Sequence, residues 1–301
     1  MNNIPQEQNK QPRLDLLAAQ RQLYSDAKFL QNNSIIIVFI AVIVGSILVA
    51  SFSQLAVYAA LWGITATLLD LLFITPSQKS IQQQAAQIQQ DFDCQVLNFD
   101  WANLHCGFRV EPELIIEASD KYKLKDPSCS ALKDWYPISI EKLPIHQARI
   151  ICQRSNISWD AKLRRRYSNW IVRVLVTLTV IVFLIGLIGG LTVTKFVLAI
   201  IMPLLPVFVL GLRQHGEHKQ AADRLHRLRE DADTIVYETI NGKLTPQDIE
   251  RKSYSLQAHI YDHRRRNPSV FDWLYNRMKT KDEQLMNKVA EDLVQQFIQK
   301  P

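Results

Sequence analysis

The stretch from Phe29 to Leu69, FLQNNSIIIVFIAVIVGSILVASFSQLAVYAALWGITATLL, contains no Asp, Glu, Lys or Arg. A second stretch, between Arg173 and Arg213, is interrupted by Lys195 alone. A helix needs about 20 apolar residues to cross the hydrocarbon of a bilayer. The whole chain of 301 residues is 48% hydrophobic and 21% charged, like an ordinary soluble protein. The uneven placement of the charges indicates instead a membrane protein with a large water-facing part.

Four segments within these stretches are long and apolar enough to span a membrane: Ile35–Phe52, Leu55–Ile74, Trp170–Leu191 and Phe196–Leu212. The connections within each pair are short, so the spans form two helical hairpins. Helices form all their backbone hydrogen bonds internally, as lipid requires, and the segments lack the alternation of apolar and polar residues that barrel strands show. A signal peptide does not fit the first segment, because a long polar segment precedes it and a second apolar run follows at once.

The basic residues predict the orientation of the spans. Of 35 Lys and Arg residues, Lys195 is the one that falls in a hairpin tip. Because positive loops stay in the cytoplasm, we expect both termini and the middle loop on that side of a cell inner membrane. The predicted domains are a cytoplasmic N-terminal interfacial helix (1–34), transmembrane hairpin 1 (35–74), a cytoplasmic middle domain (75–169), transmembrane hairpin 2 (170–212) and a cytoplasmic C-terminal helical region (213–301).

The predicted fold class is therefore an α-helical multi-pass membrane protein with two transmembrane hairpins and a mainly helical cytoplasmic part. Partial alternation over Cys94–Phe99 predicts one of a few short strands in that part. Between Ala221 and Thr239, apolar residues recur at heptad spacing. This heptad seam could assemble subunits or pack inside the chain.

Motifs for catalysis are missing from the sequence. It holds no phosphate-binding glycine loop, no H-E-x-x-H and no G-x-S-x-G. The four cysteines contain no C-x-x-C pair, and a cytoplasmic position disfavours disulfides. We therefore expect a protein that is not an enzyme, with no metal, no other cofactor and no DNA partner.

Polar residues inside the predicted spans are candidates for a pore. Asp70 and Arg173 lie at similar depth near the cytoplasmic ends of the second and third spans, where an unpaired charge is costly. They could form an ion pair or line a watery vestibule, or both could reach the interface. Thr65, Thr67 and Thr177 could line the same polar path, or they could simply let helices pack closely.

Two groups of residues are candidates for ligand binding. Arg149, Arg154, Asn156 and Trp159 combine guanidinium, amide and aromatic groups, which suit the phosphates and base of a nucleotide. Structural pairs along a helix edge are the alternative. Arg264, Arg265 and Arg266 do not adjoin a span, so they could bind a phosphate-bearing ligand or the membrane surface.

Several segments together resemble a known family. These are residues 16–28 (LLAAQRQLYSDAK), 89–94 (QQDFDC), 97–101 (LNFDW), 148–160 (ARIICQRSNISWD), 256–264, 267–268 (NP) and 273–275 (WLY). With the two hairpins between them, they resemble the four-transmembrane effectors associated with the SMODS class of nucleotidyltransferases, which belong to bacterial anti-phage signalling.

The resemblance implies an effector that is switched on by a cyclic nucleotide or oligonucleotide made on infection and then permeabilises the inner membrane. It supplies no ligand residues. Two hairpins have little polar surface, so a pore would need a homo-oligomer in the lipid bilayer. A constitutive bestrophin-like ion channel and a non-conducting membrane scaffold are the alternatives.

Overall fold

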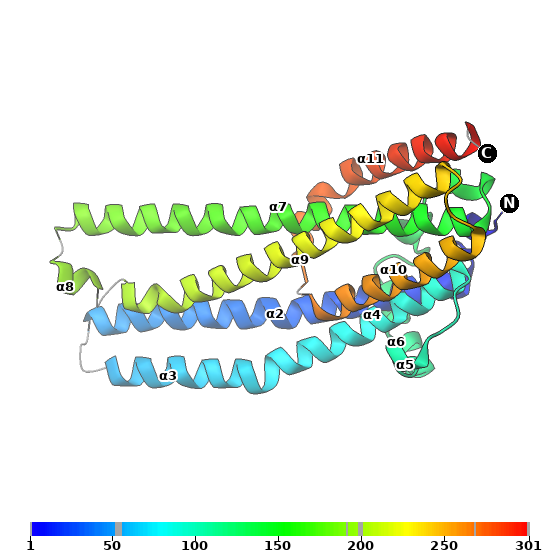
Figure 1. The fold of residues 1–301 in the computed structure, drawn as a ribbon. Coiled ribbons are helices and arrows are strands. Elements are labelled where there is room, and N and C mark those ends of the chain that lie inside the picture. The colour runs from blue at the N-terminus through cyan, green and yellow to red at the C-terminus, as the bar shows by residue number, and fades with distance from the viewer. Residues whose placement is uncertain (1, 52–55, 191, 198–200, 268, 300–301) are drawn as a thin grey trace. The chain divides into compact units, whose positions relative to one another are not determined.

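The computed structural model describes residues 2–51, 56–190, 192–197, 201–267 and 269–299, and every regular element within these ranges is a helix (Figure 1). The tip of the first predicted hairpin and parts of the third and fourth predicted spans lie outside them. In chain order the elements are α1 (Ile4–Glu7), α2 (Gln11–Ser51), α3 (Ala56–Leu69), η2 (Asp70–Ile74), α4 (Thr75–Leu97), α5 (Asn103–Cys106), α6 (Pro112–Lys123), η3 (Ser130–Leu132), η4 (Ile138–Lys142), α7 (Ile145–Ile188), α8 (Val193–Phe196), α9 (Met202–Ile240), α10 (Pro246–Arg266) and α11 (Asp272–Gln299).

The short strand predicted at Cys94–Phe99 is wrong. Helix α4 continues through this stretch to Leu97, and Asn98 then takes a positive φ of 56° that ends it. The alternation misled because Cys94 and Leu97 are also three residues apart, so both fall on one buried helical face. Across the described residues, the predicted mixture of helices and strands is replaced by helices alone.

The chain divides into two compact units. Unit 1 comprises Met1–Asp26, Ser80–Arg164 and Gln220–Pro301, and unit 2 comprises Ala27–Lys79 and Arg165–Lys219. Helices α2, α4, α7 and α9 each contribute residues to both units.

Unit 1 has an extensive apolar core, to which the N-terminal helix contributes. Leu14, Leu17 and Leu23 of α2 are buried in the same cluster as Phe92 of α4 and Ile151 of α7. The apolar face of the predicted interfacial helix is thus covered inside the protein. Burying a Leu or Phe side chain of this kind contributes about 1.5–3 kcal/mol.

The heptad seam on α9 also packs inside unit 1. Leu225 and Ala232 lie in one cluster with Ile157 of α7 and with Leu256 and Ile260 of α10. A seam of this spacing presents one apolar stripe, and here two neighbouring helices of the same chain cover it.

Both ends of α10 have clear sequence causes. Thr245 and Asp248 form a reciprocal capping box, and Pro246 occupies the first helical position. At the other end Asn267 is extended, with φ −95° and ψ 144°, because the next residue is a proline that disfavours helical backbone before it. The last turn of α10, which holds His263 and Arg264, is thereby placed precisely.

Unit 2 exposes many of its apolar side chains. On α7 these include Phe183, Ile185 and Leu187, which are 54–62% exposed, and on α3 they include Leu61 and Trp62. By length and composition, α7 is the one helix within the described residues that is suited to cross a membrane. Exposed apolar surface of this extent marks a surface that contacts a membrane or another protein.

Candidate functional site

A buried carboxylate lies at the centre of unit 1. Asp93 on α4 is fully buried and accepts three hydrogen bonds. Tyr136 donates to its Oδ1 at 2.7 Å, while Gln257 and Arg264 of α10 donate to its Oδ2 at 2.8 and 2.6 Å. A buried carboxylate is tolerated only with such partners, so Asp93 fixes α10 against α4.

Buried amides extend this network to α7. Gln257 also donates to Gln90 at 2.9 Å, and Gln153 of α7 donates to Gln257 Oε1 at 3.0 Å. The Ser253 hydroxyl in turn donates to Gln153 Oε1 at 2.9 Å. Each amide uses both its donor and its acceptor, so these contacts define a single arrangement of α4, α7 and α10.

The three consecutive arginines at the end of α10 have different environments. Arg264 is 9% exposed and pairs with Asp93, whereas Arg265 and Arg266 pair with Asp262 on the surface at 2.7 and 3.3 Å. Successive helical residues point about 100° apart, so one of three adjacent arginines can face the core. Burial opposes the charge of Arg264, but the Asp93 carboxylate outweighs it and raises the pKa of Arg264.

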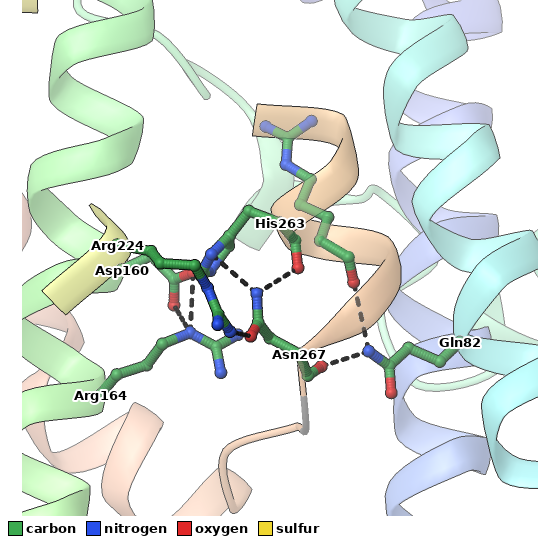
Figure 2. Close-up of polar contacts among 7 residues, drawn as sticks. Gln82, Asp160, Arg164, Arg224, His263 and Asn267 are labelled. Atoms are coloured by element: carbon green, nitrogen blue, oxygen red, sulfur yellow. Dashed lines mark hydrogen bonds and ion pairs between the residues drawn. The ribbon is translucent and has the colours of Figure 1, made fainter. Parts of the chain in front are cut away.

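A second polar cluster, the α10 clamp, holds the end of this helix (Figure 2). Asn267 accepts from Arg224 of α9 at 2.6 Å, and its own amide donates to His263 Nδ1 at 2.7 Å. Gln82 of α4 donates to the carbonyls of Arg264 and Asn267. Asp160 of α7 contacts His263 Nε2 at 2.9 Å. Side chains of α4, α7 and α9 thus all form hydrogen bonds with the C-terminal end of α10.

The clamp assigns one protonation state to His263. Arg224 can only donate, so the Asn267 oxygen faces it and the Asn267 amide N–H faces His263 Nδ1. Nδ1 is therefore an acceptor, and Nε2–H donates to Asp160. Burial lowers the pKa of His263, which keeps the ring neutral. Burial alone would raise the pKa of Asp160, but the charge of Arg164 and the His263 hydrogen bond hold it well below its ordinary value.

An aromatic group, here called the Tyr275 cluster, lies in the same unit. The Arg21 guanidinium is 4.1 Å from the centroid of the Tyr275 ring, and Trp159 meets that ring edge-on at 5.1 Å. All three side chains are half-buried. The Trp159 Nε1–H is buried and has no hydrogen-bond partner among the described residues. The predicted ligand residue Trp159 thus lies beside the Tyr275 ring of α11, which also carries the Arg21 guanidinium of α2.

The other predicted ligand residues on α7 contact the protein itself. Arg149 is buried, donates to the Leu97 carbonyl at 2.6 Å and pairs with Glu250 at 2.8 Å. Arg154 pairs with Asp233 of α9, and Asn156 is half-buried one turn before Trp159 and Asp160. Arg149 and Arg154 therefore hold helices of unit 1 together.

The predicted pore residues lie in unit 2. Asp70 begins η2, a five-residue π-helical turn, and accepts from the Thr75 hydroxyl at 3.3 Å. Such turns insert an extra residue and are frequent at functional positions. Thr65 donates to the Leu61 carbonyl at 2.9 Å. Arg173 and Thr177 are exposed, and the side chain of Thr67 is not among those that the structure describes.

Several residues of the site were not singled out as functional from the sequence. Asp93, Gln153 and Asn267 occur in the segments that carry the family resemblance, but nothing in their spacing signals a shared core. Their contacts join positions far apart in the chain, such as Asp93 with Arg264 and Gln82 with Asn267. The site as a whole can fix the register of four helices and can present donors to an acceptor-rich ligand.

Comparisons with known proteins give a consistent result. The model of the SMODS-associating 4TM effector domain matches residues 2–293. A probable CBASS effector molecule from Bacillus cereus (strain VD146) is 23% identical over 299 residues, covering 94% of this chain and 96% of that protein. No solved structure matches the chain.

Proposed function

Because the chain belongs to the SMODS-associating 4TM effector family, we propose that it is the membrane effector of a CBASS-like anti-phage system, activated by a cyclic nucleotide second messenger. The observation that carries the proposal is the contrast between its two units. Unit 1 has a buried polar core with positively charged donors, and unit 2 exposes apolar surface suited to lipid. A sensing part and a membrane part are what such an effector requires.

The proposal includes four membrane spans, Ile35–Phe52, Leu55–Ile74, Trp170–Leu191 and Phe196–Leu212. With this topology, unit 1 lies in the cytoplasm, both termini are cytoplasmic, and the protein resides in the inner membrane. The distribution of Lys and Arg supports this orientation, since Lys195 alone falls in a hairpin tip.

We further propose that the activated state is an oligomeric pore and that the protein acts without catalysis. Asp70, Arg173, Thr65, Thr67 and Thr177 are the candidate polar residues of the conducting path. Asp70 is the strongest of these, because a carboxylate in a π-helical turn inside a span has a cost that a functional role explains.

The α10 clamp offers a route from sensing to the membrane. Its residues Gln82, Asp160 and Arg224 lie within about one helical turn along the chain from Ser80, Arg164 and Gln220, where α4, α7 and α9 change from one unit to the other. A ligand shifts the equilibrium between closed and open states only by its differential affinity for them. Ligand-induced movement of α10 would change the contacts of all three helices at once.

Flux measurements on the purified full-length chain test the proposal. In liposomes loaded with a fluorescent dye, we expect release after addition of a cyclic nucleotide and little release before it. Release that is independent of nucleotide would indicate a constitutive channel. Intact liposomes under every cyclic nucleotide would remove the pore and favour a scaffold. Reporter fusions near Lys121 should report a cytoplasmic position, and a periplasmic one would overturn the topology.

A further inference from the structure

We propose that the Tyr275 cluster, together with Tyr24 and Arg264, is the binding site for the phosphate and base of the nucleotide ligand. This inference rests on the proposed function and names the residues that would carry it out. The contributing helices are α2 (Arg21 and Tyr24), α7 (Trp159), α10 (Arg264) and α11 (Tyr275).

Two buried donors that lack a hydrogen-bond partner among the described residues point to a ligand rich in acceptors. Arg264 uses Nη1 for Asp93, but its Nη2 has no hydrogen-bond partner among the described residues. The Trp159 Nε1–H is buried and is likewise without an acceptor in the described part of the chain. An unsatisfied buried donor is destabilising, and more so when the group is charged. A phosphate has the oxygens and the charge to satisfy both donors.

Tyr24 lies within the electrostatic reach of four charged groups. Burial raises the pKa of the Tyr24 hydroxyl, and the charges of Arg264, Asp160, Arg164 and Asp93 all act on it. Its side chain remains half-buried, as do those of Arg21, Trp159 and Tyr275. Tyr24 is one turn from Arg21 on α2 and Asp160 follows Trp159 on α7, so both helices connect the Tyr275 cluster to the charged groups that act on Tyr24.

The aromatic members fit the other half of a nucleotide. Bases stack on tyrosine and tryptophan faces, and such stacking tolerates different bases. Trp159 meets Tyr275 edge-on, and Arg21 lies over the Tyr275 ring. A tyrosine that contacts both an arginine and a tryptophan can take part in holding a base, while Arg264 and Trp159 Nε1 take the phosphate.

Binding of cyclic nucleotides to conservative variants of the full-length chain in detergent tests this site. The probes are cyclic di-AMP, cyclic di-GMP, cyclic GMP–AMP and cyclic tri-AMP, with inorganic phosphate as the control for charge alone. Trp159→Phe keeps an aromatic ring, although a smaller one, and removes the Nε1–H, and Tyr275→Ala removes the stacking surface. Trp135→Phe is the matched control, because Trp135 lies in the same unit beside Phe92.

We expect at least one cyclic nucleotide to bind the wild type, with affinity reduced about tenfold or more in Trp159→Phe and in Tyr275→Ala. Trp135→Phe should bind as the wild type does. Equal affinity in all four proteins would overturn the site but leave the proposed sensing function standing. Absence of binding to the wild type by every probe would overturn both. Size-exclusion profiles identical to the wild type establish that the variants are folded.

Discussion

In unit 1 the carboxylate of Asp93 is fully buried, whereas in unit 2 the side chain of Ile185 is 54% exposed. The buried carboxylate needs partners inside the protein, whereas the exposed isoleucine needs apolar surroundings outside it. Three donors from other elements compensate the burial of Asp93. The hydrocarbon of a bilayer would cover the exposed apolar side chain of Ile185. The comparison shows one chain adapted to two environments, with α7 carrying the buried Arg149 at one end and apolar outward residues at the other.

The largest expected effect comes from removing one member of the buried pair in unit 1. Arg264→Ala leaves Asp93 without its charged partner, and breaking such a pair costs about 3–5 kcal/mol of stability. Arg266→Ala is the control, because its surface pair with Asp262 contributes about 0–1 kcal/mol. Thermal unfolding of the full-length chain in detergent, followed by tryptophan fluorescence, measures both. Equal losses would show that the core of unit 1 does not depend on this pair.

The same substitution in the two units sharpens the comparison. Ile181 of α7 and Ile116 of α6 are 48% and 61% exposed. If Ile181 faces lipid, Ile181→Lys should cost about 2.5–3.5 kcal/mol of membrane insertion. Ile116→Lys places its charge in water and should have little effect. The amount of protein in the membrane fraction reports the difference, and equal amounts for both variants would contradict a lipid-facing α7.

The sequence predicts the helical fold and the composition of the two regions because charge depletion and apolar length are local properties. It fails at Cys94–Phe99 because a short apolar alternation fits a buried helical face equally well. It leaves the heptad seam ambiguous because Leu225 and Ala232 would look the same facing a second subunit or facing α7 and α10.

The site is harder to predict from the sequence. The triplet Arg264–Arg266 marks a basic cluster, but which arginine faces the core depends on the exact end of α10 and on Asp93 of another helix. Arg149 and Arg154 are of a residue type that often binds phosphate, and yet they form ion pairs with Glu250 and Asp233 of the same protein. The sequence marks Trp159 as a candidate ligand residue, whereas Arg21 and Tyr275 are distant in the chain and join the Tyr275 cluster only through packing.

Close packing in unit 2 predicts a smaller effect. A Cβ on Gly211 would lie 2.7 Å from Cδ2 of the buried Leu175, whereas a Cβ on Gly216 would meet nothing within 4 Å. Gly211→Ala should therefore cost about 1–3 kcal/mol through overpacking. Gly216→Ala should be neutral or gain up to about 1 kcal/mol, since alanine favours helix. Melting temperatures in detergent compare the two variants. Equal changes in melting temperature would mean that the Leu175 side chain can move to accommodate the added methyl group at no cost.

The smallest effect separates the α10 clamp from the rest of unit 1 by its response to pH. The folded chain lowers the pKa of His263, while the unfolded chain restores it to about 6.5. The unfolded state then binds more protons, so stability should fall as the pH drops below about 6.5. Asp160 stays charged in this range because Arg164 and His263 hold its pKa well below the ordinary value. Arg224 also belongs to the clamp and donates to Asn267.

His263→Gln tests this assignment, because a glutamine amide can donate to Asp160 and accept from Asn267 in the same sense as the neutral ring. The variant should lose less stability than the wild type between pH 7 and pH 5, measured by thermal unfolding in detergent. His226→Gln is the control, since His226 is 51% exposed and pairs only with Glu230 on its own helix among the described contacts. The opposite outcome is a pH dependence that remains in His263→Gln and disappears in His226→Gln. Protonation of His263 would then cost no stability, and the arrangement of donors inferred for the α10 clamp would be wrong.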